Sequence, residues 1–124
     1  MKELRFTMEN QPGALAKIAS ALGEARVNID GIAGLGLEDK GLICLAIDDP
    51  GAARKILQDL GVEFKENQPL VIDISNHPGE LATLLRRLAD DGINVQSLYA
   101  GVERNKLVLT VDNIARAKEI LRIA

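Results

Sequence analysis

The chain has 124 residues, 47% of them hydrophobic, and a formal net charge of −3 at pH 7. Because nucleic acid affinity rests on clustered lysine and arginine, the acidic balance excludes a nucleic acid partner. No apolar run reaches membrane length and the N-terminus lacks the apolar core of a signal peptide, so we expect no membrane contact.

The chain begins with a predicted strand and helix. Residues 4 to 8 alternate between apolar and polar side chains, the period of a strand with one buried face. Asn10 stands where a helix cap or an Asx turn belongs, and Pro12 presets φ for a turn or a first helical turn. Apolar residues at helical spacing then predict a helix from about residue 13 to about 25.

Two further strands follow. Val27, Ile29 and Ile32 begin the second strand, the Gly34 to Gly41 stretch is predicted to turn the chain, and residues 42 to 47 form the third strand. Cys44, the single cysteine, lies in this apolar run, which indicates a buried reduced thiol in a cytoplasmic protein. Both faces of the third strand are apolar, so we expect part of the second face to be buried in a homodimer.

A second helix and a short strand complete the first half. Pro50 starts the helix, Gly61 stands at its C′ position, and residues 62 to 66 form the strand. The order βαββαβ is the ferredoxin-like arrangement, an α+β fold with two helices on one face of an antiparallel sheet.

The second half repeats the first. Asn10-Gln11-Pro12-Gly13-Ala14-Leu15-Ala16 returns as Asn76-His77-Pro78-Gly79-Glu80-Leu81-Ala82, and Asn28 and Asn94 follow the two frames at equal spacing. The copies are offset by 66 positions up to the second strand and by 64 beyond the central turn, so two residues were gained or lost there. Such repetition predicts two similar domains, residues 1–67 and 68–124.

The second copy lacks room for a last strand. Its predicted elements are a strand at 70–75, a helix ended by Gly92, strands at 93–102 and 107–111, and a helix at 114–122. We expect the two repeats side by side in one antiparallel sheet with helices on one face. The unmatched edge is then left open, covered by another segment, or completed by a partner chain.

These motifs resemble the ACT domain family, small regulatory modules of βαββαβ topology. Polar residues before Pro-Gly, an aliphatic helix and then Val27-Asn28-Ile29 or Ile93-Asn94-Val95 carry the resemblance twice. It implies a non-catalytic, allosteric sensor without cofactor, which binds an amino acid or similar metabolite at the seam of two domains and acts on a regulated enzyme. In serine-sensing members a His precedes the loop Asn, whereas this chain has Met8 and Ile74, so the resemblance does not single out serine.

The residues themselves are compatible with a zwitterionic ligand. A helix that begins at glycine lets a carboxylate approach free N–H groups, and an Asn side chain both donates and accepts. Asp30 and Gln96 follow the strand asparagines on the same strand face, where Asp30 favours an ammonium group. The candidate ligand contacts are Asn10, Gln11, Pro12, Gly13, Ala14, Asn28 and Asp30 in the first copy and Asn76, His77, Pro78, Gly79, Glu80, Leu81, Asn94, Gln96 and Tyr99 in the second.

The two predicted pockets are unequal, because His77 replaces Gln11 and Tyr99 replaces Ala33. No second His and no spaced cysteines exist for a metal site. Simpler roles stay open: Pro-Gly is turn chemistry, and Asp48-Asp49 and Asp112-Asn113 precede helices as caps.

Two other functions compete with the sensor. One is a structural oligomerisation module without ligand. The other is an enzyme similar to acylphosphatases, which are also ferredoxin-like. Those enzymes hold phosphate with an Arg in the first loop, and Glu9 to Gly13 and Ser75 to Gly79 contain none.

Overall fold

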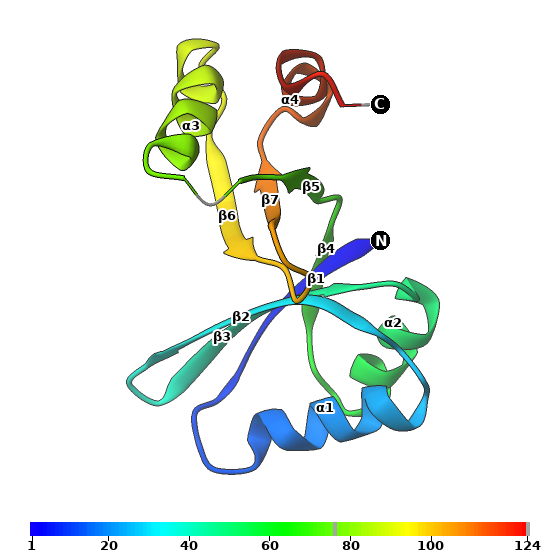
Figure 1. Ribbon diagram of the computed structural model, residues 1–124. Helices are drawn as coiled ribbons and strands as arrows, with labels where there is room; N and C mark the ends of the chain where they lie inside the picture. The colour runs from blue at the N-terminus through cyan, green and yellow to red at the C-terminus, as the bar shows by residue number, and fades with distance from the viewer. Residues whose placement is uncertain (76, 124) are drawn as a thin grey trace. The chain divides into compact units, whose positions relative to one another are not determined.

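The computed structural model describes residues 1–75 and 77–123, and the chain divides into two compact units, Met1–Asn67 and Gln68–Ala124. The first unit has the predicted order βαββαβ (Figure 1). Its elements are β1 Lys2–Glu9, α1 Ala14–Glu24, β2 Ile29–Leu37, β3 Lys40–Ile47, α2 Pro50–Asp59 and β4 Phe64–Asn67. All strand pairs are antiparallel, in the order β2-β3-β1-β4.

The second unit repeats this order without a counterpart of β4 among the residues that the structure describes. Its elements are β5 Leu70–Asp73, α3 Glu80–Asp90, β6 Val95–Ala100, β7 Lys106–Val111 and α4 Ile114–Leu121. The three strands form an antiparallel sheet in the order β5-β7-β6. The α+β class and the tandem ferredoxin-like repeats are therefore confirmed.

The prediction of one continuous sheet is wrong, because the strands form two sheets, one in each unit. Only Gln68 and Pro69 stand between β4 and β5. A two-residue hairpin needs positive φ, whereas a residue before proline favours extended backbone, and proline has no N–H for a ladder. β5 pairs with β7 in the sheet of the second unit.

Each unit has an aliphatic core on one face of its sheet. Residues of both helices belong to each core, so both helices of a unit cover the same face, as predicted. The first core consists of Leu4, Phe6, Ile18, Leu22, Val27, Ile43, Leu45, Ile47, Ala53 and Leu57. The second and smaller core consists of Leu70, Leu88, Ile93, Leu109 and Ala117.

Cys44 lies on β3 as a buried free thiol, as predicted. Burial raises the pKa of the Cys44 thiol, so the thiol stays protonated at neutral pH. No helix within residues 1–75 and 77–123 is long and apolar enough to span a membrane.

The Pro-Gly pairs form the turns that join the first strand and first helix of each unit. The Ala14 N–H donates to the Gln11 carbonyl at 3.2 Å, and Gly13 has φ 86° and ψ −12°. Proline followed by a residue with positive φ is typical of a type II turn. The second unit repeats the turn, since the Glu80 N–H donates to the His77 carbonyl at 3.2 Å and Gly79 has φ 89°. Turn geometry thus explains why both copies keep proline and glycine.

The chain turns within the predicted stretch from Gly34 to Gly41, but the turn is shorter than this stretch. β2 continues to Leu37 and β3 begins at Lys40, so only two residues turn the chain. Glu38, the first of them, takes the positive φ of 57° that a short hairpin turn requires. Gly36 lies inside the ladder, where a Cβ would stand 2.9 Å from Nδ2 of Asn10. This glycine therefore permits a close approach.

The hairpin of the second unit is shorter. β6 ends at Ala100, which pairs with Leu107, whereas the equivalent pair of Gly34 and Ile43 in the first unit is followed by further pairs out to Leu37 and Lys40. In the second unit the Gly101 N–H donates to the Lys106 carbonyl at 2.8 Å, and the chain turns directly after. The two-residue difference between the copies lies in this hairpin.

Replacing Gly13 by alanine should destabilise the protein by about 1 to 2 kcal/mol, because a Cβ at φ 86° is strained. Gly23→Ala is the matched control. Neither added Cβ would meet a neighbour within 4 Å, but Gly23 lies inside α1, where alanine should stabilise by roughly 0.5 to 1 kcal/mol. Urea denaturation measures both, and equal effects of the two variants would contradict the left-handed turn.

Candidate functional site

The predicted ligand residues of each unit divide between the two ends of its sheet. β1 and β2 both pair antiparallel with β3, so they run in the same direction. Asn10 follows the last residue of β1, whereas Asn28 precedes the first residue of β2. The nine residues of β2 span about 26 Å at about 3.3 Å per step. Asn10 and Asn28 of one unit therefore do not share a pocket.

Asn10 binds the hairpin of its own unit. Its side-chain Nδ2 donates to the Glu38 carbonyl at 3.0 Å, and its backbone N–H donates to the Asp39 carbonyl at 2.8 Å. Of the two roles expected for Asn10, a helix cap or an Asx turn, the structure excludes the cap, because Gly13 holds the N-cap position and no described side chain caps α1. Asn10 instead fastens the loop to the hairpin.

At the other end, each strand asparagine is held through its main chain. The Asn28 N–H donates to Oδ1 of Asp48 at 2.9 Å, and the Asn94 N–H donates to Oδ1 of Asp112 at 3.0 Å. Both aspartates were expected as helix caps. Instead, each fixes the residue that precedes the second strand of its unit, β2 or β6. The caps are the residues that follow them, Asp49 for α2 and Asn113 for α4.

The positions two residues after these asparagines lie in β-bulges. The register shifts at Asp30 in β2 and at Gln96 in β6. A bulge leaves its extra residue unpaired and redirects the side chain. In the first unit, Nδ2 of Asn28 donates to Oδ1 of Asp30 at 2.7 Å, so these two predicted side chains do meet.

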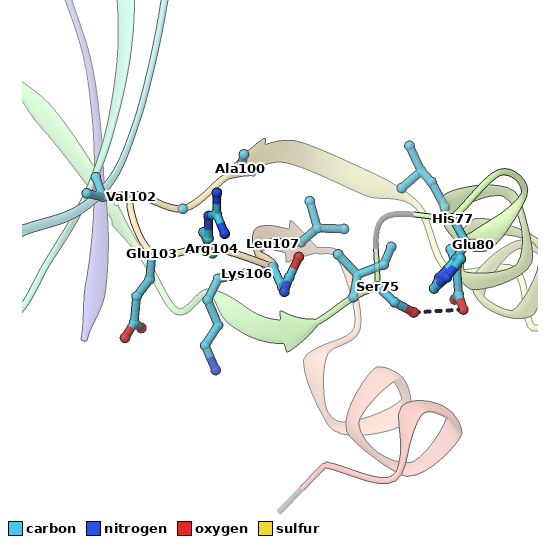
Figure 2. A pocket seen from close by; sticks show the side chains of 13 residues that line it. Ser75, His77, Glu80, Ala100, Val102, Glu103, Arg104, Lys106 and Leu107 are labelled. Atoms are coloured by element: carbon cyan, nitrogen blue, oxygen red, sulfur yellow. Dashed lines mark hydrogen bonds between the residues drawn. The ribbon is translucent and has the colours of Figure 1, made fainter.

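An open cleft lies between the Pro-Gly loop and the hairpin of the second unit. Its volume is about 730 Å³, within the range of small-molecule sites. Figure 2 shows Ser75, His77 and Glu80 on one side and Arg104 on the other. The lining residues are Ile74, Ser75, His77, Glu80, Leu81 and all residues from 100 to 107.

The cleft contains charges of both signs. Glu80 accepts a hydrogen bond from Oγ of Ser75 at 3.1 Å. The hydrogen bond to Asp73 raises the pKa of Lys106, so this cation is permanent at neutral pH but already paired. Among the described residues, the Arg104 side chain has no hydrogen-bond or ion-pair partner. The arrangement offers a carboxylate and an available guanidinium to a zwitterion.

Only part of the predicted site lines this cleft. The predicted residues that line it are His77, Glu80 and Leu81. Those that do not are Pro78, Gly79, Asn94, Gln96 and Tyr99. Asn76 lies outside the described residues. Residues 100 to 107 of the hairpin line the cleft but were not among the predicted contacts. The two-residue shift between the copies had already indicated that this segment differs.

No group of His, Cys, Asp and Glu that could hold a metal ion occurs in the described part of the chain. The chemistry that the cleft offers is ion pairing, hydrogen bonding and apolar contact.

A family model described as an ACT domain pair matches residues 1–124. Among solved structures, a protein of Bacteroides thetaiotaomicron is 25% identical with a TM-score of 0.86, over 98% of this chain and 85% of that chain. The ligand-free regulatory subunit of aspartate kinase from Thermus thermophilus is 16% identical with a TM-score of 0.76, over 98% and 87%. For the aspartate kinase of Clostridium acetobutylicum the values are 15% and 0.65, over 98% of this chain and 32% of that chain. No curated protein is significantly similar to the chain.

Removing the Asn10 amide should loosen the first hairpin. Asn10→Ala loses the 3.0 Å bond to the Glu38 carbonyl, which corresponds to about 1 kcal/mol of stability. Hydrogen exchange measured by mass spectrometry should become faster in residues 35 to 42. Gln11→Ala, in the same exposed loop, is the control. Unchanged exchange in Asn10→Ala would show that the hairpin does not depend on this contact.

Proposed function

The chain belongs to the ACT domain family, as a pair of such domains over residues 1–124, and from this premise we propose that it is a non-catalytic regulatory protein that binds a free amino acid. Binding shifts the protein between two arrangements for which the ligand has different affinity. The signal then passes to another protein or to a change in assembly.

The cleft beside the second Pro-Gly loop carries this proposal. It joins a carboxylate, a guanidinium and apolar side chains within one open volume of about 730 Å³. An α-amino acid needs these three kinds of contact for its ammonium, its carboxylate and its side chain.

The proposed partner is a regulated enzyme. Structural neighbours include a protein named as a regulatory subunit of aspartate kinase, of which the chain covers 87%, and a whole aspartate kinase, of which it covers 32%. A regulatory role beside a separate catalytic subunit is compatible with both likenesses. We further propose a homodimer in the cytoplasm, on the sequence arguments given above.

The other predicted contacts are also part of the proposed ligand site. The first Pro-Gly loop, from Asn10 to Ala14, and the strand starts at Asn28 with Asp30 and at Asn94 with Gln96 are proposed as ligand contacts that a neighbouring copy of the chain completes. Asn28 already holds Asp30, so its side-chain oxygen is the atom left to accept from a ligand ammonium.

Titration with the twenty amino acids tests the function. A ligand at a hundred times its Kd should stabilise the folded protein by about 2.7 kcal/mol, which corresponds to a melting temperature higher by on the order of 10 °C. Isothermal titration calorimetry gives the affinity, and the D-enantiomer of any ligand found is the control.

Absence of binding by all twenty, with unchanged melting temperatures, would leave the structural oligomerisation module as the better description. In that case the oligomeric state should be the same with and without amino acids.

A further inference from the structure

β5 has a free outer edge. The N–H of Ile74, directly after β5, donates to the Asn105 carbonyl at 2.8 Å on the side of β7. Bonded residues alternate along an antiparallel ladder, so the N–H and C=O groups of Val71 and Asp73 point away from β7. Among the described residues β5 pairs with no other strand. The edge therefore presents main-chain groups to which a further strand can bond.

The first unit shows what a strand at this edge contributes. There β4 pairs antiparallel with β1, and Phe64 of β4 lies opposite Phe6. The half-buried Phe64 side chain packs against the core on the helix side of the sheet. That core includes Phe6, Ile18 and Leu57, each at most 4% exposed. A large apolar side chain on the fourth strand thus closes this side of the first core.

The second unit has a cavity of about 210 Å³ at the equivalent place. Ile72, Leu84 and Leu121 line it, and the repeat aligns these residues with the three core residues of the first unit just named. Ile72 and Leu121 are only half-buried. The other lining residues are Asp73, Ile74, Glu80, Thr83 and Arg87. Since no described residue of the second unit takes the place of Phe64, this cavity is the unfilled side of the second core.

A charged group beside the same edge also has a partner only in the first unit. Nε of Arg54 on α2 donates to Oε1 of Glu66 at 2.6 Å, and Glu66 lies on β4 opposite Leu4. Lys118 holds the position of Arg54 on α4 and is half-buried. Among the described residues its side chain has no hydrogen-bond or ion-pair partner. A carboxylate in the place of Glu66 would pair with this ammonium.

We propose that the free edge of β5 is the docking site for an extended segment of the partner protein, which joins the sheet as an antiparallel strand. The segment carries an aromatic or large aliphatic residue opposite Ile72, for the cavity, and an acidic residue two positions later, for Lys118. Main-chain bonds to Val71 and Asp73 give affinity, and the two side chains give specificity. The inference rests on the proposed function only for the partner, a regulated enzyme.

A second copy of the chain does not supply this segment. In each copy Glu66 already pairs with Arg54. If two β5 strands pair with Val71 opposite either Val71 or Asp73, the residue opposite Leu70 is Ile72 or Ile74. Lys118 would then have no carboxylate beside it.

Titration of the ¹⁵N-labelled full chain with a blocked peptide, followed by NMR, tests the edge. The peptide is Val-Lys-Phe-Lys-Glu-Asn, residues 62 to 67 of the chain with lysine in place of Glu63. This lysine comes opposite Asp73, whose side chain is 80% exposed, and like charges opposite each other destabilise a sheet. We expect saturable shifts of the amides of residues 70 to 74 and of α4. Serine in place of the phenylalanine should weaken binding about ten- to a hundredfold.

A charge exchange tests the contact with Lys118. Lys118→Glu should weaken binding of the peptide about three- to tenfold, and a peptide with lysine in place of its glutamate should restore it. A merely structural role of Lys118 would not produce this restoration. Lys17→Glu, the same change at an exposed position of α1, is the control and should leave binding unchanged. Circular dichroism melting curves report the folding of both variants.

Several results would overturn the inference. One is the absence of saturable shifts in residues 70 to 74, and another is equal binding of the serine peptide. Shifts confined to β1 would show that the peptide replaces β4 instead. Shifts of residues 70 to 74 that arise from raising the concentration of the chain alone would assign the edge to a second copy. None of these results bears on amino acid binding, which the titration with the twenty amino acids tests separately.

Discussion

The left-handed glycine of the Pro-Gly turn is the constraint on which both units depend. Gly13 and Gly79 have nearly the same φ, 86° and 89°, and each directs the chain from its first strand into its first helix. With this direction, buried helix residues such as Leu22 and Leu88 pack on the sheet. In the first unit Asn10, in the same loop as this turn, also binds the hairpin between β2 and β3.

Much of the fold could be predicted from the sequence, because local signals agree with one another. Alternating apolar residues, Pro50 at a helix start and Gly61 and Gly92 after helix ends all correspond to the structure, where both glycines have positive φ. Because the sequence repeats, the elements of the second half could be predicted from those of the first. The turn within Gly34 to Gly41 is shorter than predicted, because glycine signals a turn in isolation, whereas here Gly36 accommodates a side chain distant in sequence.

The candidate site was less predictable, since it depends on contacts between distant segments. Asn10 and Asn28 share a residue type and a motif, yet they lie at opposite ends of the sheet and bind different partners, the Glu38 carbonyl and the Asp48 carboxylate. From the sequence, Arg104 was predicted only as part of a turn, with no contact to a ligand. Its position opposite Glu80 follows from the register of β6 and β7, which the sequence does not encode locally.

β5 is a strand with one neighbour. Among the described residues it pairs only with β7, whereas β1, its counterpart, lies between β3 and β4. Ile74, which follows β5 and lines the cleft, is thus attached to the sheet through a strand anchored on one side. Such a strand opens locally more readily than one with two neighbours. Under the proposed function, a ligand in the cleft restricts this motion, and the second unit then transmits occupancy as a loss of conformational entropy, without any change in its average shape.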